Sequence, residues 1–381
     1  MKPLLPSGCY DLLPPYARQE SELSHALLSV FESYGYEEVS PPLLEYSDNL
    51  LAGRGSALSS QIFRVMDSAS HKVMGIRADI TLQVARIAST RLAHAPRPLR
   101  ICYNGLIMRM NGEQLKSNRQ LHQTGIELIG VATPEADAEV IIVAAEALRK
   151  AGIQKISIDL NLPEIVSALL AAEKLDEEQA KNLFSAIAHK DVSTIRLMNF
   201  AYRDTLIALM QSAGAAETAL PAIERMDLPD SARRQFADLK QVVSILKSRG
   251  DDNWQITIDA TENRGAGYHS GIGFSIFVAG VASEVGRGGR YKIQGNSANE
   301  DAEATGFTLY VENLLEILPQ PERGKRIFVK DGISSNDSEK LHAQGFTIIY
   351  ALSEYGRGED EAKRLGCGWI YKDGKVLEIA G

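Results

Sequence analysis

The sequence predicts an α+β protein in which helices flank an antiparallel sheet. Residues 101–109 and 123–130 are two runs rich in Ile, Leu and Tyr, joined by a polar segment, as in a hairpin. Further strand patterns at 254–262, 264–277 and 286–293 resume the sheet later in the chain. Much of the sequence between these two groups carries helical periodicity instead. Strands and helices grouped in separate blocks are the pattern of an α+β fold.

The first predicted element is an amphipathic helix over 15–34, which Gly35 ends. The segment YEEVSPPLLEY follows as a short strand that Pro41 and Pro42 interrupt. Because proline lacks the N–H that a strand ladder needs, we expect this strand at a sheet edge or at an interface.

Residues 72–89 read as a strand that runs into a helix beginning at about Thr81. Asp79 and Thr81 stand at the turn between the two elements. Asp and Thr are also favoured just before a first helical turn, so capping alone accounts for the pair. The residues by themselves leave this alternative open.

A helix with clear ends is predicted over about 134–151. Thr133 suits its N-cap and Gly152 its end. A strand follows at 156–162, and residues 163–249 then read as helices with no strand pattern. We interpret this block as a helical insertion into the sheet domain.

The last segment, 325–381, has the order β-α-β-α-β-β of a small α/β tail. The chain therefore divides into the first part of a core at 1–160, the insertion at 161–250, the second part of the core at 251–320 and a C-terminal domain at 321–381.

The composition is that of an ordinary globular protein: 381 residues, 44% hydrophobic, 24% charged, with a net charge of −8. The sequence shows neither a leader pattern nor an apolar run of about 20 residues, so we expect no membrane partner. Cys9, Cys102 and Cys367 are widely spaced, which favours a cytoplasmic protein with buried cysteines over disulfides or a zinc site. The glycine-rich runs match neither common phosphate loop, and we expect no metal and no cofactor.

Polar residues gather on the hairpin. Arg109 ends its first strand, and Gln123 and Glu127 lie four apart on the second, so both face the same side. Arg can clamp a carboxylate, Gln can orient an amide-type contact, and Glu can hold a cationic or N–H group. These are the groups of an amino acid. The alternative is an ordinary half-buried hairpin whose polar residues face outward.

The hairpin closely resembles the second signature of class II aminoacyl-tRNA synthetases in its histidyl form. There, an Arg ends one strand and an HQ-x-G-x-E run opens the next, which His122, Gln123, Gly125 and Glu127 fit. The order of the helix at 15–34, the short strand and the two prolines resembles the first signature, which in that family forms the homodimer interface. The resemblance implies a class II synthetase-like fold, and a helical insertion follows the same strand in that family.

Other matches concern substrate contacts in the histidyl family. The turn at Asp79 and Thr81 resembles R-P-E-G-T, which holds the substrate amino group, although Asp79 is shorter than Glu. Arg264 and Tyr268 match R-G-L-D-Y-Y, and His269 replaces its second Tyr, which faces the imidazole. The resemblance implies a histidine site in which Glu127 and His269 face the side chain. Its candidate residues are Asp79, Thr81, Arg109, Gln123, Glu127, Arg264, Tyr268 and His269.

The third signature departs from the family pattern. It reads G-F-x-x-G-x-E-R-L in the synthetases, and its Arg holds the ATP γ-phosphate, but here Tyr310 replaces the second Gly and Asn313 the Arg. Asn111 likewise replaces a Glu of the hairpin. Phosphate chemistry depends on fixed cations, which an Asn cannot supply, and Tyr310 would crowd a nucleotide. We therefore expect no catalytic residues.

Over nearly its whole length the chain resembles the ATP phosphoribosyltransferase regulatory subunits of histidine biosynthesis. This synthetase-like family assembles with a short catalytic phosphoribosyltransferase chain. The resemblance implies a non-catalytic partner that allows the short enzyme to work and conveys feedback inhibition by histidine. It also implies a homodimer within a larger hetero-oligomer.

A tRNA partner is not expected, because residues 322–381 hold ten Lys/Arg and ten Asp/Glu and so have no net charge to attract phosphates. Two other functions stay open: a divergent histidyl-tRNA synthetase, and another synthetase-like regulator that senses an amino acid. Within the preferred function, histidine could also bind between the two kinds of subunit, with His269 only filling the former pocket.

Overall fold

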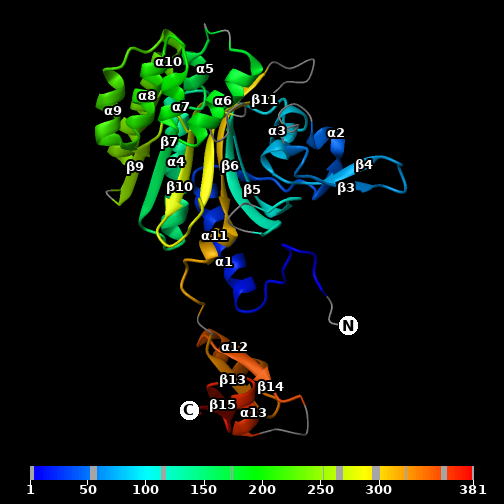
Figure 1. The fold of residues 1–381 in the computed structure, drawn as a ribbon. Coiled ribbons are helices and arrows are strands. Elements are labelled where there is room, and N and C mark those ends of the chain that lie inside the picture. The colour runs from blue at the N-terminus through cyan, green and yellow to red at the C-terminus, as the bar shows by residue number, and fades with distance from the viewer. Residues whose placement is uncertain are drawn as a thin grey trace. The chain divides into compact units, whose positions relative to one another are not determined.

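The computed structural model describes residues 4–51, 58–112, 117–171, 173, 175–251, 253–262, 269–293, 301–321, 324–352 and 358–379. The chain forms two compact units (Figure 1). The first comprises Met1–Leu12 and Ala17–Leu318, and the second comprises Leu13–Tyr16 and Pro319–Gly381.

A nine-stranded sheet forms the centre of the first unit, in the order β1-β5-β6-β12-β11-β10-β7-β9-β8. The strands from β5 to β7 in this order are antiparallel to their neighbours, whereas β1 and β9 pair in parallel with β5 and β7. The predicted antiparallel α+β core is confirmed. The strands are β1 Glu37–Glu38, β5 Leu99–Met108, β6 Gln120–Ile129, β7 Ile156–Asn161, β8 Gly214–Ala215, β9 Trp254–Ile258, β10 His269–Val278, β11 Gly286–Ile293 and β12 Ala302–Tyr310.

Helices α1 and α4 cover one face of this sheet, and α10 packs against α4 (Figure 1). Phe31 of α1 meets Phe307 of β12 edge to face, with ring centroids 5.5 Å apart. Helix α3 packs on the opposite face. The helices of this unit are α1 Tyr16–Ser33, α2 Ser47–Leu50, α3 Thr81–Ser89, α4 Pro134–Lys150, α5 Ile165–Leu169, α6 Glu177–Ala188, α7 Val192–Leu197, α8 Arg203–Gln211, α9 Ala216–Glu224, α10 Asp230–Arg249 and α11 Val311–Leu315.

Helix α4 has the ends that its sequence predicts. The hydroxyl of Thr133 accepts a hydrogen bond from the N–H of Ala136 at 3.3 Å, which satisfies one of the unpaired donors of the first turn. The helix ends before Gly152, which has a φ of +92° that other residues rarely adopt.

The proline-interrupted segment differs from the prediction of a single strand. It forms two strands in two sheets: β1 lies at an end of the large sheet, and β2, Leu44–Tyr46, belongs to a three-stranded sheet with β4, Val73–Ile76, and β3, Phe63–Met66. The carbonyls of Pro41 and Pro42 accept hydrogen bonds from the side chains of Arg77 and Gln83, both at 2.8 Å. Side chains thus pair the carbonyls that a neighbouring strand would otherwise pair, and the prolines have no N–H to donate.

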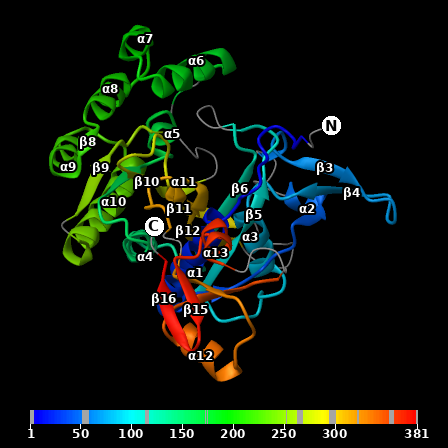
Figure 2. The ribbon, with the colours of Figure 1, turned by 90° about the horizontal axis from the view of Figure 1, so that it is seen from below.

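Helices α5 to α10 occupy the predicted helical block (Figure 1). The prediction that this block contains no strand is wrong at Gly214–Ala215, because this pair forms β8 against β9. Two residues are too few to show a period, and their partner strand lies more than forty residues later in the chain. Figure 2 shows α9 beside β8 and β9.

The second unit contains a four-stranded sheet in the order β14-β13-β15-β16. The predicted succession β-α-β-α-β-β is confirmed. Its elements are β13 Arg326–Val329, α12 Ser335–Ala343, β14 Thr347–Tyr350, α13 Glu359–Arg364, β15 Trp369–Lys372 and β16 Lys375–Glu378.

All three cysteines are free. Cys102 and Cys367 are buried as predicted, but Cys9 is only half-buried. Among the helices that the structure describes, none is both long and apolar enough to cross a membrane.

Candidate functional site

A row of paired residues crosses the large sheet on the face opposite α1 and α4. It runs from Asn161 on β7 through Gly273, Gly289 and Gly306 to Glu127 on β6. A side chain at Gly306 would collide with the carboxylate of Glu127, and one at Gly273 with the amide oxygen of Asn161. The glycines are therefore needed because polar side chains from the outer strands lie flat over the inner ones.

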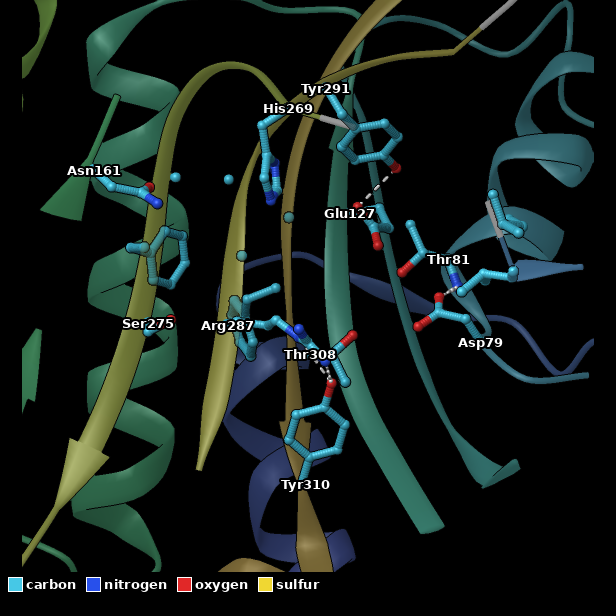
Figure 3. Close-up of a pocket in the computed structure, with 18 of the residues that line it drawn as sticks. Asp79, Thr81, Glu127, Asn161, His269, Ser275, Arg287, Tyr291, Thr308 and Tyr310 are labelled. Atoms are coloured by element: carbon cyan, nitrogen blue, oxygen red, sulfur yellow. Dashed lines mark hydrogen bonds between the residues drawn. The ribbon is translucent and has the colours of Figure 1, made fainter. Parts of the chain in front are cut away.

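A cavity of about 320 Å³ lies over this row (Figure 3). This volume is at the low end of small-molecule sites. The charged and titratable groups along its wall are Asp79, Arg109, Glu127, His269, Arg287, Tyr291 and Tyr310.

Glu127 is the most deeply buried acid of the cavity. Its side chain is almost fully buried, and the hydroxyl of Tyr291 donates to its Oε2 at 2.8 Å. Loss of hydration raises the pKa of Glu127 to about 8, against the opposing effect of hydrogen bonds from Tyr291 and Thr81. At neutral pH this carboxyl group is therefore mostly protonated.

Asp79 and Gln123 together fix the turn before α3. One carboxylate oxygen of Asp79 accepts from the N–H of Thr81 and the other from Nε2 of Gln123, both at 2.9 Å. The amide oxygen of Gln123 accepts from the N–H of Ile80 at 3.0 Å. Asp79 thus stabilises the start of α3, as the capping alternative holds, and it also borders the cavity. Gln123 does not line the cavity but positions the turn that does.

The prediction of an outward-facing polar hairpin fails for Gln123 and Glu127, because both are almost fully buried. Thr81 borders the cavity, and its hydroxyl lies 3.3 Å from that of Tyr103. The structure thus brings Asp79, Thr81 and Glu127 together as acceptors on one side of the cavity (Figure 3).

Two arginines and a tyrosine form the other charged part of the wall. Arg109 follows β5 as predicted, and Arg287 comes from β11. Both donate to the hydroxyl of Tyr310, Arg287 from two nitrogens at 3.0 and 2.8 Å and Arg109 at 3.4 Å. Each guanidinium also lies over the Tyr310 ring, 5.7 Å (Arg109) and 5.6 Å (Arg287) from its centroid.

His269 borders the cavity from the start of β10. Its Nδ1 lies 3.3 Å from the carbonyl oxygen of Arg290. Because a carbonyl only accepts, Nδ1 carries the proton in this contact, and in the neutral ring Nε2 is then an acceptor. Arg264 and Tyr268, the other two predicted site residues of this segment, lie outside the described residues.

Asn313 lies away from the cavity wall. Its side-chain amide is buried and donates to the carbonyl of Glu284 at 2.8 Å. The side chain therefore serves the packing of α11 against the strand ends.

Several residues of the wall were not predicted as site residues, namely Asn161, Arg287, Tyr291 and Thr308. Tyr291 ends the run GGRY at 288–291, and Arg287 lies two positions before Gly289 on the same strand face. Because alternate residues of a strand face the same side, Arg287 could have been predicted as a site residue from its position relative to Gly289. Asn161 could not, because only the pairing of its strand with β10 brings it to the site.

The wall has the charge pattern of a zwitterion site. Acceptors at Asp79, Thr81 and Glu127 suit N–H and ammonium groups, and the cations Arg109 and Arg287 suit a carboxylate. Within the described ranges, no cluster of three or more His, Cys, Asp or Glu side chains could hold a metal ion.

Residues 8–314 match the histidyl-tRNA synthetase family. The fold is similar to that of a Bacillus halodurans protein named as an ATP phosphoribosyltransferase regulatory subunit/histidyl-tRNA synthetase, with a TM-score of 0.81, 21% identity, and coverage of 96% of this chain and 97% of the other. The molecule has the class II histidyl-tRNA synthetase-like fold that the sequence predicts.

Two relatives are similar over almost the full chain. The ATP phosphoribosyltransferase regulatory subunit of Paramagnetospirillum magneticum is 43% identical over 99% of this chain and 98% of its own. That of Rhodospirillum centenum is 39% identical over 99% and 96%. The chain belongs to the family of ATP phosphoribosyltransferase regulatory subunits.

Proposed function

We propose that this chain is a non-catalytic regulatory subunit that activates a short-form ATP phosphoribosyltransferase and conveys feedback inhibition by histidine. Family membership supports the regulatory role, since the relatives are named as regulatory subunits of this enzyme. The observation that carries the absence of catalysis is the contact of Tyr310 with both Arg109 and Arg287.

Adenylation needs cations that face the nucleotide phosphates, because charge and position stabilise the transition state of phosphate chemistry. In this chain the Tyr310 hydroxyl accepts from both arginines of the wall. Asn313, at the position of the family's third-signature Arg, carries no charge and donates to a backbone carbonyl. These contacts favour a protein that keeps an amino-acid pocket and has given up activation of the amino acid.

The pocket suits histidine. We assign Asp79 and Thr81 to its ammonium group, Arg109 with Arg264 to its carboxylate, and Glu127 with His269 to its side chain. A buried Glu127 that exchanges a hydrogen bond with an imidazole selects for histidine. An analogue without the N–H leaves a buried polar group unpaired, which costs about 1–3 kcal/mol.

The function is tested by mixing the purified protein with a short-form catalytic chain and measuring phosphoribosyl transfer with and without histidine. We expect activity only in the mixture, and inhibition by histidine. A catalytic chain that is equally active alone would contradict the proposal.

The alternative position for the effector, between the two kinds of subunit, is tested by Glu127→Ala. We expect calorimetry to show that this variant loses most of its affinity for histidine. We also expect its mixture with the catalytic chain to lose feedback inhibition, because an effector acts through its own differential binding. Unchanged affinity and unchanged inhibition would place the effector elsewhere.

A further inference from the structure

One polar atom of the cavity wall stands apart from the rest. Asn161 is 8% exposed, and in the described part of the chain its amide oxygen has no hydrogen-bond partner. Buried side-chain oxygens in native proteins are almost always paired, so an unpaired one in a cavity wall points to a ligand.

The orientation of the Asn161 amide is determined by its other end. Its Nδ2 donates to the backbone carbonyl of Glu262 at 3.1 Å. Reversing the amide would set two oxygens against each other, so the atom that lies over Gly273 is the acceptor Oδ1. This site therefore calls for an N–H donor.

Asn161 and Glu127 enter the cavity from opposite sides, as Figure 3 shows, with His269 between them. Each lies over the glycine of the neighbouring strand, Gly273 and Gly306 respectively. Two strand spacings of about 4.8 Å, or roughly 10 Å in total, separate those glycines. A hydrogen bond of about 2.9 Å at each end leaves roughly 4 Å between the two acceptors for the side chain of one ligand.

We infer that Asn161 Oδ1 accepts a hydrogen bond from the side-chain N–H of the bound amino acid, at the end remote from Asp79 and Thr81, the acceptors assigned to its ammonium group. The ligand class is an amino acid with a neutral N–H in its side chain, lying across the glycine row. Histidine meets this condition through the ring nitrogen farther from its α-amino group. The inference rests on the proposed histidine binding and adds a specificity-determining residue to it.

The Asn161 amide suits this task because it does not titrate. The carboxylate of Asp79 on the near side attracts the ammonium group, whereas a neutral acceptor on the far side discriminates for a neutral N–H without adding charge. A side chain of similar shape that has no N–H would leave Oδ1 buried and unpaired. The position therefore rejects apolar isosteres of histidine.

The test is calorimetry on the full chain with three probes: histidine and its two ring-N-methylated isomers. For the wild type we expect the isomer methylated on the far nitrogen to bind at least about 10-fold more weakly than histidine. In Asn161→Ala, histidine itself should weaken by about 10-fold, and the penalty for that methyl group should fall to within about 3-fold.

Asn161→Asp distinguishes the two roles of this side chain: accepting a hydrogen bond from the ligand, and donating one to the backbone carbonyl of Glu262. This variant keeps an oxygen toward the cavity but does not donate to the carbonyl when ionised. If Asn161 only holds the backbone at Glu262 in place, the Ala and Asp variants will lose the same affinity for histidine. If Asn161 accepts a hydrogen bond from the ligand, the Asp variant will still bind histidine more tightly than the isomer methylated on the far nitrogen. Thermal unfolding of each variant checks that it is folded.

The outcomes are distinguishable. No heat of binding with histidine on the wild type overturns histidine binding to the isolated chain, and this inference with it. Histidine binding that Asn161→Ala leaves within about 2-fold of the wild type, or methylated isomers that the wild type binds as well as histidine, overturns the role of Asn161 alone.

Discussion

The hydroxyl of Tyr310 accepts hydrogen bonds from two nitrogens of Arg287, at 3.0 and 2.8 Å. Hydrogen bonds with a charged donor are stronger than neutral ones, and this phenol is almost fully buried. The bonds therefore tie the end of β12 to β11 at one edge of the cavity.

Tyr310→Phe should remove this link. We expect the free energy of unfolding to fall by about 1–3 kcal/mol, because the guanidinium groups of Arg109 and Arg287 lose the acceptor that they share. Denaturant unfolding measures the loss. Tyr350→Phe is the control: its hydroxyl is 3.4 Å from that of Ser338 at an exposed site, and its loss should cost little. Equal stability of Tyr310→Phe and the wild type would show that the link is weak.

The lack of a third-signature Arg leads to a chemical prediction. The protein should catalyse no histidine-dependent exchange of pyrophosphate into ATP, since Asn313 brings no charge to the nucleotide site. Radiolabelled pyrophosphate exchange is the measurement. Robust exchange would exclude the regulatory function and favour a divergent synthetase.

Gly306→Ala should damage both fold and site. The added methyl group meets the Glu127 carboxylate and the backbone oxygen of Ile126, and only the first of these can move. We expect a loss of about 1–3 kcal/mol in stability together with weaker histidine binding. Gly332→Ala is the matched control, because nothing lies within 4 Å of a methyl group there. A Gly306→Ala protein that binds histidine normally would argue against Glu127 as a ligand contact.

Stability should depend on pH through Glu127. Its pKa in the folded protein is about 8, above the ordinary 4.5, so the folded state holds more protons than the unfolded state between these values. This contribution to stability is complete below about pH 4.5 and is lost as the pH rises through 8, at up to about 1.4 kcal/mol per pH unit.

Glu312, with a pKa of about 7, acts in the same direction, but its contribution is largely lost above pH 7. Glu127→Gln should therefore reduce the remaining fall in the free energy of unfolding between pH 7 and pH 8. Denaturant unfolding at both values, for wild type and variant, provides the comparison. Parallel curves would mean that Glu127 ionises normally in the folded chain.

Assembly gives a further prediction. Helix α1 and the segment with Pro41 and Pro42 should form a symmetric interface, since two-fold contacts are the commonest way for identical chains to associate. We expect light scattering at micromolar concentration to give at least a dimer, and a larger complex once the catalytic chain is added. A monomer under both conditions would contradict this.

The sequence correctly predicted the helices and strands whose ends are marked by local residues. Thr133 and Gly152 bound α4 as expected, and the hairpin strands alternate as their residues suggest. The parity that placed Gln123 and Glu127 on one face is also correct. The two-residue period of a strand does not predict how deeply a side chain is buried. Both side chains are buried, because α3 and the turn at Asp79 cover that face.

The contacts that the sequence did not predict are those between distant segments. Asn161 enters the site because β7 pairs with β10, more than a hundred residues later, and no local pattern shows this pairing. The same holds for β8, whose two residues become a strand only through β9. The split of one strand into β1 and β2 follows from the prolines, but the place of β2 in a second sheet comes from its pairing with β4, about thirty residues later.

The nine-stranded sheet ends on both sides in strands of only two residues, β1 and β8. Long exposed edges invite pairing with another chain, and short edges with charged residues and nearby prolines resist it. Glu37 and Glu38 make up all of β1, and Pro41 follows closely. Copies of this chain should therefore associate through side-chain packing and not by extending one sheet into the next, which also protects a wide sheet from fibril growth.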